Sequence, residues 1–303
     1  MKKPYVLLSF LCGALLWSCA GKSSNGVHTL DDLDNTINNC SAYREKKQQR
    51  IDSLKDEYRK AGNSREQFDA LDALLAEYRV FNADSALHYC VLRQEIAEHT
   101  GDPNDVLTAR LNMAEQLGMT GNYIEAMAMV EPLNSTDLPD YLQSYLFHIK
   151  RTFYGRIGDI ALRDTDRRRY MDLTDKYRDS LLLANKGNLL VYTLINSDRL
   201  NSHGQPEAGV KMLKEFMRTH KLQDHEIAVF AYTLSNSYRL LGDKENLKNQ
   251  LIISSIHDLR SSVKEYIALR ELALLLYQEG DVNRAYKYLN QCMQDSRECN
   301  ARQ

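Results

Sequence analysis

Two stretches of this 303-residue sequence match part of a motif that binds phosphate or zinc, and each motif lacks a required residue. Gly21–Ser23 ends like a phosphate-binding loop, but Leu16 stands where the first glycine of that loop is needed. The pair His225–Glu226 starts like a zinc-protease helix, but Val229 replaces the second histidine. Neither a G-x-S-x-G turn nor a glycine-rich dinucleotide loop occurs. The sequence therefore predicts no catalytic residues, no enzymatic activity and no cofactor.

Acidic and histidine residues do not form a metal-binding pattern either. Asp31, Asp32 and Asp34 are spaced like the start of a calcium loop but lack its glycine and terminal glutamate, so we expect a solvated helix start. The eight histidines are scattered, and His220 and His225 flank an expected interhelical loop, where surface positions are favoured. We predict no metal site.

The charge pattern argues against nucleic acid as a partner. The chain has 39 Lys and Arg residues against 41 Asp and Glu residues, so it carries no basic surplus. The local basic run Arg167–Arg169 is surrounded by aspartates, which predicts a charge-balanced, exposed helix face.

The first twenty residues predict an export signal. Two lysines precede an uncharged, mostly apolar run at 6–17, which is too short to span a bilayer. Leu16–Cys19 then resembles a bacterial lipobox, so residues 1–19 are expected to be a signal peptide with Cys19 as the lipidated mature N-terminus. Ordinary cleavage after Ala20 is the alternative. Residues 20–28 form a polar tether, and the predicted location is the cell envelope, as a periplasm-facing, membrane-anchored lipoprotein.

Four further cysteines lie in the body of the chain: Cys40, Cys90, Cys292 and Cys299. They show no metal-ligand spacing, and the last two are about 10 Å apart along a helix, beyond disulfide reach. They are interpreted as small core or surface residues, with a disulfide between distant positions left open.

The body of the chain repeats a helix–break–helix pattern. The breaks fall at Asn82, Gly121-Asn122, Gly158-Asp159, His203-Gly204, Gly242-Asp243 and Gly280-Asp281, with steps of 39, 37, 46, 38 and 38 residues. A near-constant step of this size is typical of α-helical repeats. We therefore expect an all-α fold, a right-handed solenoid of about six TPR-like helical hairpins over residues 61–303.

The last repeat shows how such a hairpin is specified. Gly280 can end the first helix with a positive φ, and Asp281 can cap the next helix. Ala273 and Ala285 are small where the two helices are expected to cross. These small residues at these offsets resemble the tetratricopeptide repeat (TPR).

Both ends of the body have their own patterns. Residues 29–60 are expected to form a long amphipathic helix that packs on the first repeat. The final helix is expected to bury one apolar stripe, formed by Val282, Ala285, Tyr286, Leu289, Cys292 and Met293, with Tyr288 outside it. A helix covered on one side suggests a terminal cap, so the fold is expected to be complete at about residue 299.

Three blocks carry a closer resemblance: LDDLDNTINN with REKKQQRIDSLK, EYRVFNADSALHYC, and SSVKEYIALRELALLLYQEGDVNRAYKYLNQCMQDSRECNAR. They look like a Bacteroidota family of TPR-containing regulators with a C-terminal domain of unknown function, over residues 30–302. The resemblance implies a periplasmic sensor region followed by a membrane helix, a coiled coil and a helix-turn-helix domain. Because this sequence stops at Gln303, the alternative function is the truncated sensory half of such a regulator.

The remaining candidate site is the groove lined by the first helix of each hairpin. Its expected partner-binding residues are Tyr232, Asn236, Arg239, Arg270, Tyr277 and Gln278. Tyrosine and arginine often anchor interfaces, although Tyr232 and Tyr277 could equally pack between hairpins. We predict a non-enzymatic scaffold or sensor that binds a protein or peptide, contacts the membrane through its lipid and has no nucleic-acid partner; self-association is left open.

Overall fold

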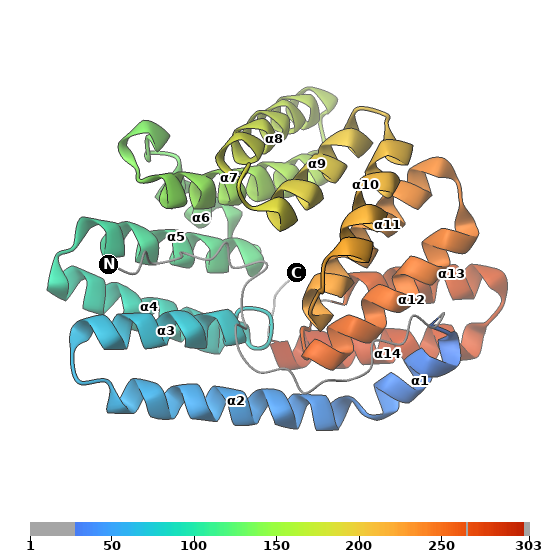
Figure 1. Cartoon of the computed structure of the whole chain (residues 1–303), viewed down its shortest axis with the longest axis horizontal. Helices are drawn as coiled ribbons and strands as arrows, with labels where there is room; N and C mark the ends of the chain where they lie inside the picture. The colour runs from blue at the N-terminus through green and yellow to red at the C-terminus, as the bar shows by residue number, and fades with distance from the viewer. Residues whose placement is uncertain (1–27, 265, 300–303) are drawn as a thin grey trace. The chain divides into compact units, whose positions relative to one another are not determined.

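The computed structural model describes residues 28–264 and 266–299, and helices account for nearly all of these residues (Figure 1). Two helices come first, α1 (Leu30–Asn38) and α2 (Cys40–Lys60). Six helical hairpins follow: α3 (Ser64–Tyr78) with α4 (Ala83–Thr100), α5 (Pro103–Met119) with α6 (Tyr123–Val130), α7 (Asp140–Ile160) with α8 (Asp164–Ala184), α9 (Leu189–Ser202) with α10 (Pro206–Thr219), α11 (Asp224–Leu241) with α12 (Lys244–Ser261), and α13 (Ile267–Glu279) with α14 (Val282–Cys299). The predicted all-α fold of about six TPR-like hairpins is confirmed.

The helices form two compact units. The first contains residues 51–195, and the second contains residues 28–50 together with the described part of 196–299. Each unit has its own core: Leu142, Tyr145 and Ile149 lie in a core of the first, and Leu251, Leu272 and Tyr288 lie in that of the second. No helix among the described residues has both the length and the apolar character needed to cross a membrane.

The turn at Gly280 forms as the sequence predicted. Gly280 has φ +91° and its N–H bonds to the carbonyls of the last helical turn of α13. The Asp281 side chain then accepts the backbone N–H of Arg284 at 3.1 Å and caps α14. Ala273 and Ala285 are both buried in the core of this hairpin, where bulk would separate the helices.

The break predicted at Gly158-Asp159 is wrong. Helix α7 continues to Ile160, and the turn lies at residues 161–163. Gly158 is a packing residue instead of a cap, because a Cβ at this position would lie 2.8 Å from the terminal methyl carbon of Met171 in α8. A glycine inside a helix thus marks close helix contact here, and sequence alone does not distinguish that use from a turn.

The segment expected as one helix over 29–60 is divided at Asn39. The Asn39 backbone leaves the helical region, with φ −102° and ψ 8°, although its backbone N–H and its side-chain amide both donate to the carbonyl oxygen of Asn35, at 3.2 and 2.7 Å. Ile51 and Leu54, in the second half of α2, lie in a core with α3 and α4, as expected for packing on the first repeat. Leu33 and Ile37 of α1 lie elsewhere, in a core with α12, α13 and α14.

The final helix buries only part of the predicted stripe. Ala285 and Cys292 are buried and Leu289 packs on the same core, as predicted. Val282, Tyr286 and Met293 are exposed, whereas Tyr288 is fully buried. The reason is that α1 and the start of α2 cover a polar side of α14, where Arg44 pairs with Glu298 at 3.0 Å and Lys287 pairs with Asp34 at 2.9 Å. The expectation of a helix covered on one side only, which suggested a terminal cap, is therefore incorrect.

Candidate functional site

Two of the predicted groove residues bond to a glutamate that the sequence did not single out, and a third joins them through Arg239. The Tyr232 hydroxyl donates to Glu271 Oε1 at 3.1 Å, and Arg239 forms an ion pair with Glu271 Oε2. Arg239 also donates from Nη1 to Asn236 Oδ1 at 2.7 Å. We call these four residues of α11 and α13 the α11–α13 polar cluster. It joins the first helices of two consecutive hairpins.

The α11–α13 polar cluster is partly open to solvent. The Arg239 side chain is 45% exposed and that of Glu271 is 24% exposed, so the guanidinium keeps accessible N–H donors while its charge is balanced. Tyr232 is half-buried and packs against the core of the second unit. The alternative of a packing role therefore holds for the Tyr232 ring, while its hydroxyl belongs to the polar cluster.

The other three predicted residues form a separate strip on α13. Arg270, Tyr277 and Gln278 are exposed, and Leu274 between them is exposed too. Arg270 and Tyr277 are seven residues apart, which places them on one helix face. We call these four residues the α13 strip. The structure thus divides the predicted groove residues into a paired cluster and an exposed strip with an aromatic, a leucine and a cation.

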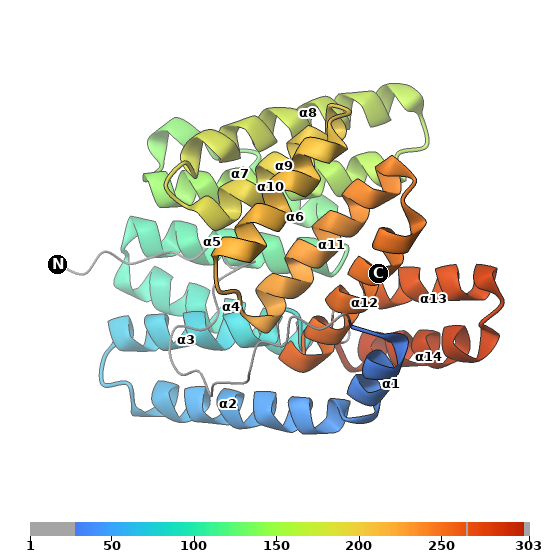
Figure 2. The same cartoon turned by 45° about the vertical axis from the view of Figure 1, so that its right-hand side comes forward.

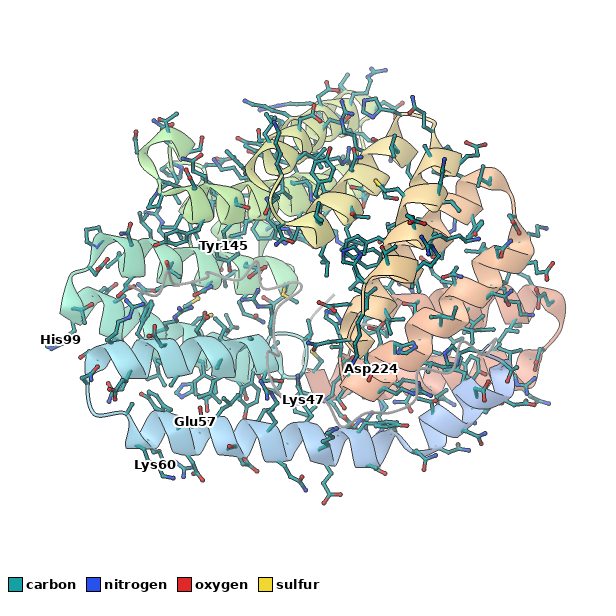
Figure 3. All side chains as sticks on the ribbon, viewed as in Figure 1. Lys47, Glu57, Lys60, His99, Tyr145 and Asp224 are labelled. Carbon is teal, nitrogen blue, oxygen red and sulfur yellow. The ribbon has the colours of Figure 1, made fainter. Side chains whose placement is uncertain are left out.

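Histidines and carboxylates pair locally instead of gathering around a metal. His257 Nδ1 lies 2.6 Å from Asp224 Oδ1 (Asp224 is labelled in Figure 3), and His28 stands edge-on to His257 with ring centroids 5.4 Å apart. Burial lowers the pKa of His28, and the neighbouring His257 and Arg260 add to this effect. Among the described residues no three His, Cys, Asp or Glu side chains are placed to hold a metal ion.

The first two aspartates of the calcium-like spacing have other partners. Asp32 closes a capping box with Thr29, accepting the Thr29 backbone N–H at 2.8 Å. Asp31 forms an ion pair with Arg284 of α14. These carboxylates therefore start and hold α1.

Cys40, Cys90 and Cys292 are free thiols. Burial raises the pKa of both Cys90 and Cys292 to about 12, so these two thiols are protonated at neutral pH and are poor nucleophiles. The predicted role as small core residues fits both. Cys19, the expected lipidation site, lies outside the described residues.

The basic run on α8 is exposed, as expected. Arg168 and Arg169 line a shallow hollow of this helix together with Asp172 and Lys176. Arg167 donates to the carbonyl oxygen of Ala161 at 3.1 Å. An aspartate within the hollow offsets part of its positive charge, which agrees with a charge-balanced face.

A buried polar network in the first unit was not found from the sequence. Arg79, which follows α3, pairs with Glu115 of α5, and both side chains are buried. The hydroxyl of Tyr145, labelled in Figure 3, donates to Glu115 Oε2 at 2.6 Å. His148 Nε2 lies 3.9 Å from the other carboxylate oxygen. One carboxylate therefore links α3, α5 and α7.

The same network extends to α4. Asn112 donates to the Tyr145 hydroxyl at 3.0 Å, and Arg93 donates to the Asn112 side chain. Arg93 also pairs with Asp72 at 2.6 Å and lies 4.1 Å from the centre of the Phe68 ring. Residues as far apart in sequence as Asp72 and Tyr145 converge here, so no local pattern could have indicated the network.

Burial controls the protonation of this network. It raises the pKa of Tyr145, whose neighbour Glu115 adds to the effect, and it lowers the pKa of His148 to about 3, with Arg151 and Arg79 adding to it. Glu115 does not raise the pKa of His148 again, because its carboxylate is already paired with Arg79 in the buried core. His148 and Tyr145 are therefore neutral at pH 7 and lie beside the buried Arg79–Glu115 ion pair. These contacts hold the helices in position, and neither ring is set to exchange a proton near neutral pH.

Comparison with known proteins gave a family match. The family model described as the SusR N-terminal TPR domain matches residues 37–303. A search of curated proteins found no match.

Proposed function

Since the chain belongs to the SusR N-terminal TPR domain family, we propose that it is a non-enzymatic protein- or peptide-binding module that acts as a scaffold or sensor in the cell envelope. The predicted resemblance to a Bacteroidota family of TPR-containing regulators is confirmed by this match. TPR-type domains generally mediate protein–protein interaction. The coarse function follows from the family, and the site, the anchor and the sensing role are our proposals.

The α13 strip is the observation that carries the proposed binding site. It exposes 63% of Tyr277 and 49% of Leu274 next to Arg270. Tyrosine and arginine are among the side chains that most often anchor a protein partner, and Leu274 adds apolar surface between them. The adjoining α11–α13 polar cluster supplies N–H donors of Arg239 for backbone carbonyls or carboxylates of a bound segment.

The experiment is capture from envelope extract by immobilised protein. The double variant Arg270→Ala, Tyr277→Ala should lose the captured partner while its thermal unfolding stays unchanged, because both side chains are exposed. The matched control is Arg297→Ala, Tyr286→Ala on α14, which also removes an exposed cation and an exposed tyrosine. Equal capture by the two double variants would place the binding site elsewhere.

A lipid anchor at Cys19 would hold this module at the membrane, with the lipobox-like Leu16–Cys19 as its support. The second candidate function is the sensory region of a membrane-bound transcription regulator. It is favoured because the matching family is described as an N-terminal domain. Sequencing the gene beyond codon 303 separates the two: an in-frame membrane helix and helix-turn-helix would select the regulator.

A further inference from the structure

Helix α1 lies in a groove made by other helices of the second unit. It packs on α12 and borders α14 in both views (Figures 1 and 2). Leu33 is fully buried and Ile37 nearly so, in one core with Leu251, Ile252 and Ile256 of α12 and Tyr288 of α14. We call these last four residues, with Arg284 and Lys287, the α12–α14 groove. It provides an apolar floor for two side chains spaced one helical turn apart.

The rim of the α12–α14 groove matches the charge of α1. Arg284 donates from Nε to Asp34 Oδ2 at 2.9 Å and also pairs with Asp31, while Lys287 Nζ contacts Asp34 Oδ1 at 2.9 Å. The Tyr288 hydroxyl donates to the carbonyl oxygen of Leu30 at 3.4 Å. Apolar anchors on one face and carboxylates along one edge make α1 a specific occupant of this groove.

Helix α1 is held by the groove and is not part of a hairpin. It has nine residues, of which Leu33, Thr36 and Ile37 are buried. A helix of this length is unstable in water by itself, so it folds only against a surface. Its link to α2 is the single residue Asn39, with φ −102° and ψ 8°, and this residue is neither glycine nor proline.

The sequence of this link also suits a continuous helix. Apolar residues recur at three- and four-residue steps from Leu30 through Ile37 and Cys40, with no helix-breaking residue between them. If residue 39 became helical, α1 would continue the axis of α2 and leave the groove of its own chain. Arg44 would keep α2 attached to α14 through Glu298. The occupant that fits the vacated groove is then α1 of a second copy, because every contact that forms within one chain can form between two.

We propose that α1 is exchangeable, with Asn39 as the hinge, so that two copies of this protein form a dimer by placing α1 of each into the α12–α14 groove of the other. This domain exchange creates no new interface chemistry, and the monomer and dimer share the same contacts. The two forms differ in the conformation of residue 39, and the fraction of dimer rises with protein concentration. The inference does not depend on the proposed function, since the groove uses none of the residues of the α13 strip.

The first test changes the hinge. Asn39→Ala removes the side-chain bond to Asn35 and raises helix propensity, which should favour the continuous helix by about threefold at each hinge. Because the dimer contains two hinges, its association constant should rise by about tenfold. Asn39→Gly, the matched control, should shift the equilibrium towards monomer. Sedimentation equilibrium of the whole protein over a wide concentration range measures both. Monomers throughout in wild type and in Asn39→Ala would overturn the proposal.

The second test asks which surfaces meet. Leu33→Asp should prevent α1 from docking while leaving the groove intact, and Arg284→Asp with Lys287→Asp should disable the groove while leaving α1 intact. Neither variant should form the exchanged dimer with itself, but a mixture should form a heterodimer through the one competent pair. A dimer of the Leu33→Asp variant by itself would show that a different surface associates, and the proposal would fail.

If Leu33→Asp unfolds the second unit, a labelled peptide of residues 28–39 replaces it. The peptide should bind the wild-type protein in competition with α1, and binding should be lost in the Arg284→Asp, Lys287→Asp variant but kept in Arg297→Asp, which alters an exposed arginine of the same helix. Equal peptide binding by both variants would contradict the groove.

Discussion

His148 is a neutral histidine buried beside the ion pair of Arg79 and Glu115. Its surroundings lower its pKa to about 3, mainly because burial disfavours the charged ring. The unfolded chain returns this pKa to about 6.5. Above pH 6.5 both states are neutral at this site. Between pH 6.5 and 3 only the unfolded state binds the proton, so acidification favours unfolding.

At the residue scale this gives a pH prediction. The free energy of unfolding should fall by about 1.4 kcal/mol per pH unit through this one group as the pH drops below 6. Denaturant titrations at a series of pH values, comparing wild type with His148→Gln, measure the contribution. The glutamine variant should show the smaller loss on acidification.

The matched control is His99→Gln, which changes an exposed histidine at the end of α4 (Figure 3). It should follow the wild-type pH profile. An identical profile for His148→Gln would mean that this ring gains a proton in the folded protein and that its burial has no effect on its titration.

At the scale of elements, the hairpin of α13 and α14 offers the most direct test of packing. Ala273 is fully buried where the two helices approach. Ala273→Leu inserts three carbons at this contact and should lower the free energy of unfolding by about 1–3 kcal/mol through overpacking. Chemical denaturation with circular dichroism detection measures the change. Leu274→Ala, one position along and half-exposed, is the control with a much smaller effect.

The same hairpin shows where sequence patterns mislead. A three- and four-residue period predicted that Val282, Tyr286 and Met293 of α14 face the core, and all three are exposed. The core instead receives Tyr288, because α1 covers the side of α14 that carries Arg284 and Lys287. A helix face can be covered through paired charges as well as through apolar residues. A search for apolar periodicity detects only the second kind of face.

At the scale of the whole molecule, anchoring is the property that the N-terminal residues predict. If Cys19 is lipidated, the mature protein should partition into the detergent phase, and Cys19→Ala should move it to the aqueous phase. Mass spectrometry of the mature N-terminus gives an independent readout. An unmodified N-terminus at Gly21 would support ordinary cleavage after Ala20 and exclude the anchor.

Family and fold class could be predicted from the sequence because both depend on local features. Gly280 must adopt a positive φ and Asp281 must cap a helix whatever surrounds them, so a hairpin can be identified from a few adjacent residues. Repetition of that signal along the chain predicted six hairpins, and the all-α fold confirms them.

The contacts between distant residues were decided only by tertiary structure. Glu271 bonds to Tyr232 and Arg239 of another hairpin, and Glu115 bonds to Tyr145 of α7 and to Arg79, which follows α3. An acidic residue in a helix has the same local pattern whether it faces water or a buried arginine. Which of the two it meets depends on helix packing, and for that reason Tyr232 and Arg239 could be named from the sequence while the glutamate that joins them could not.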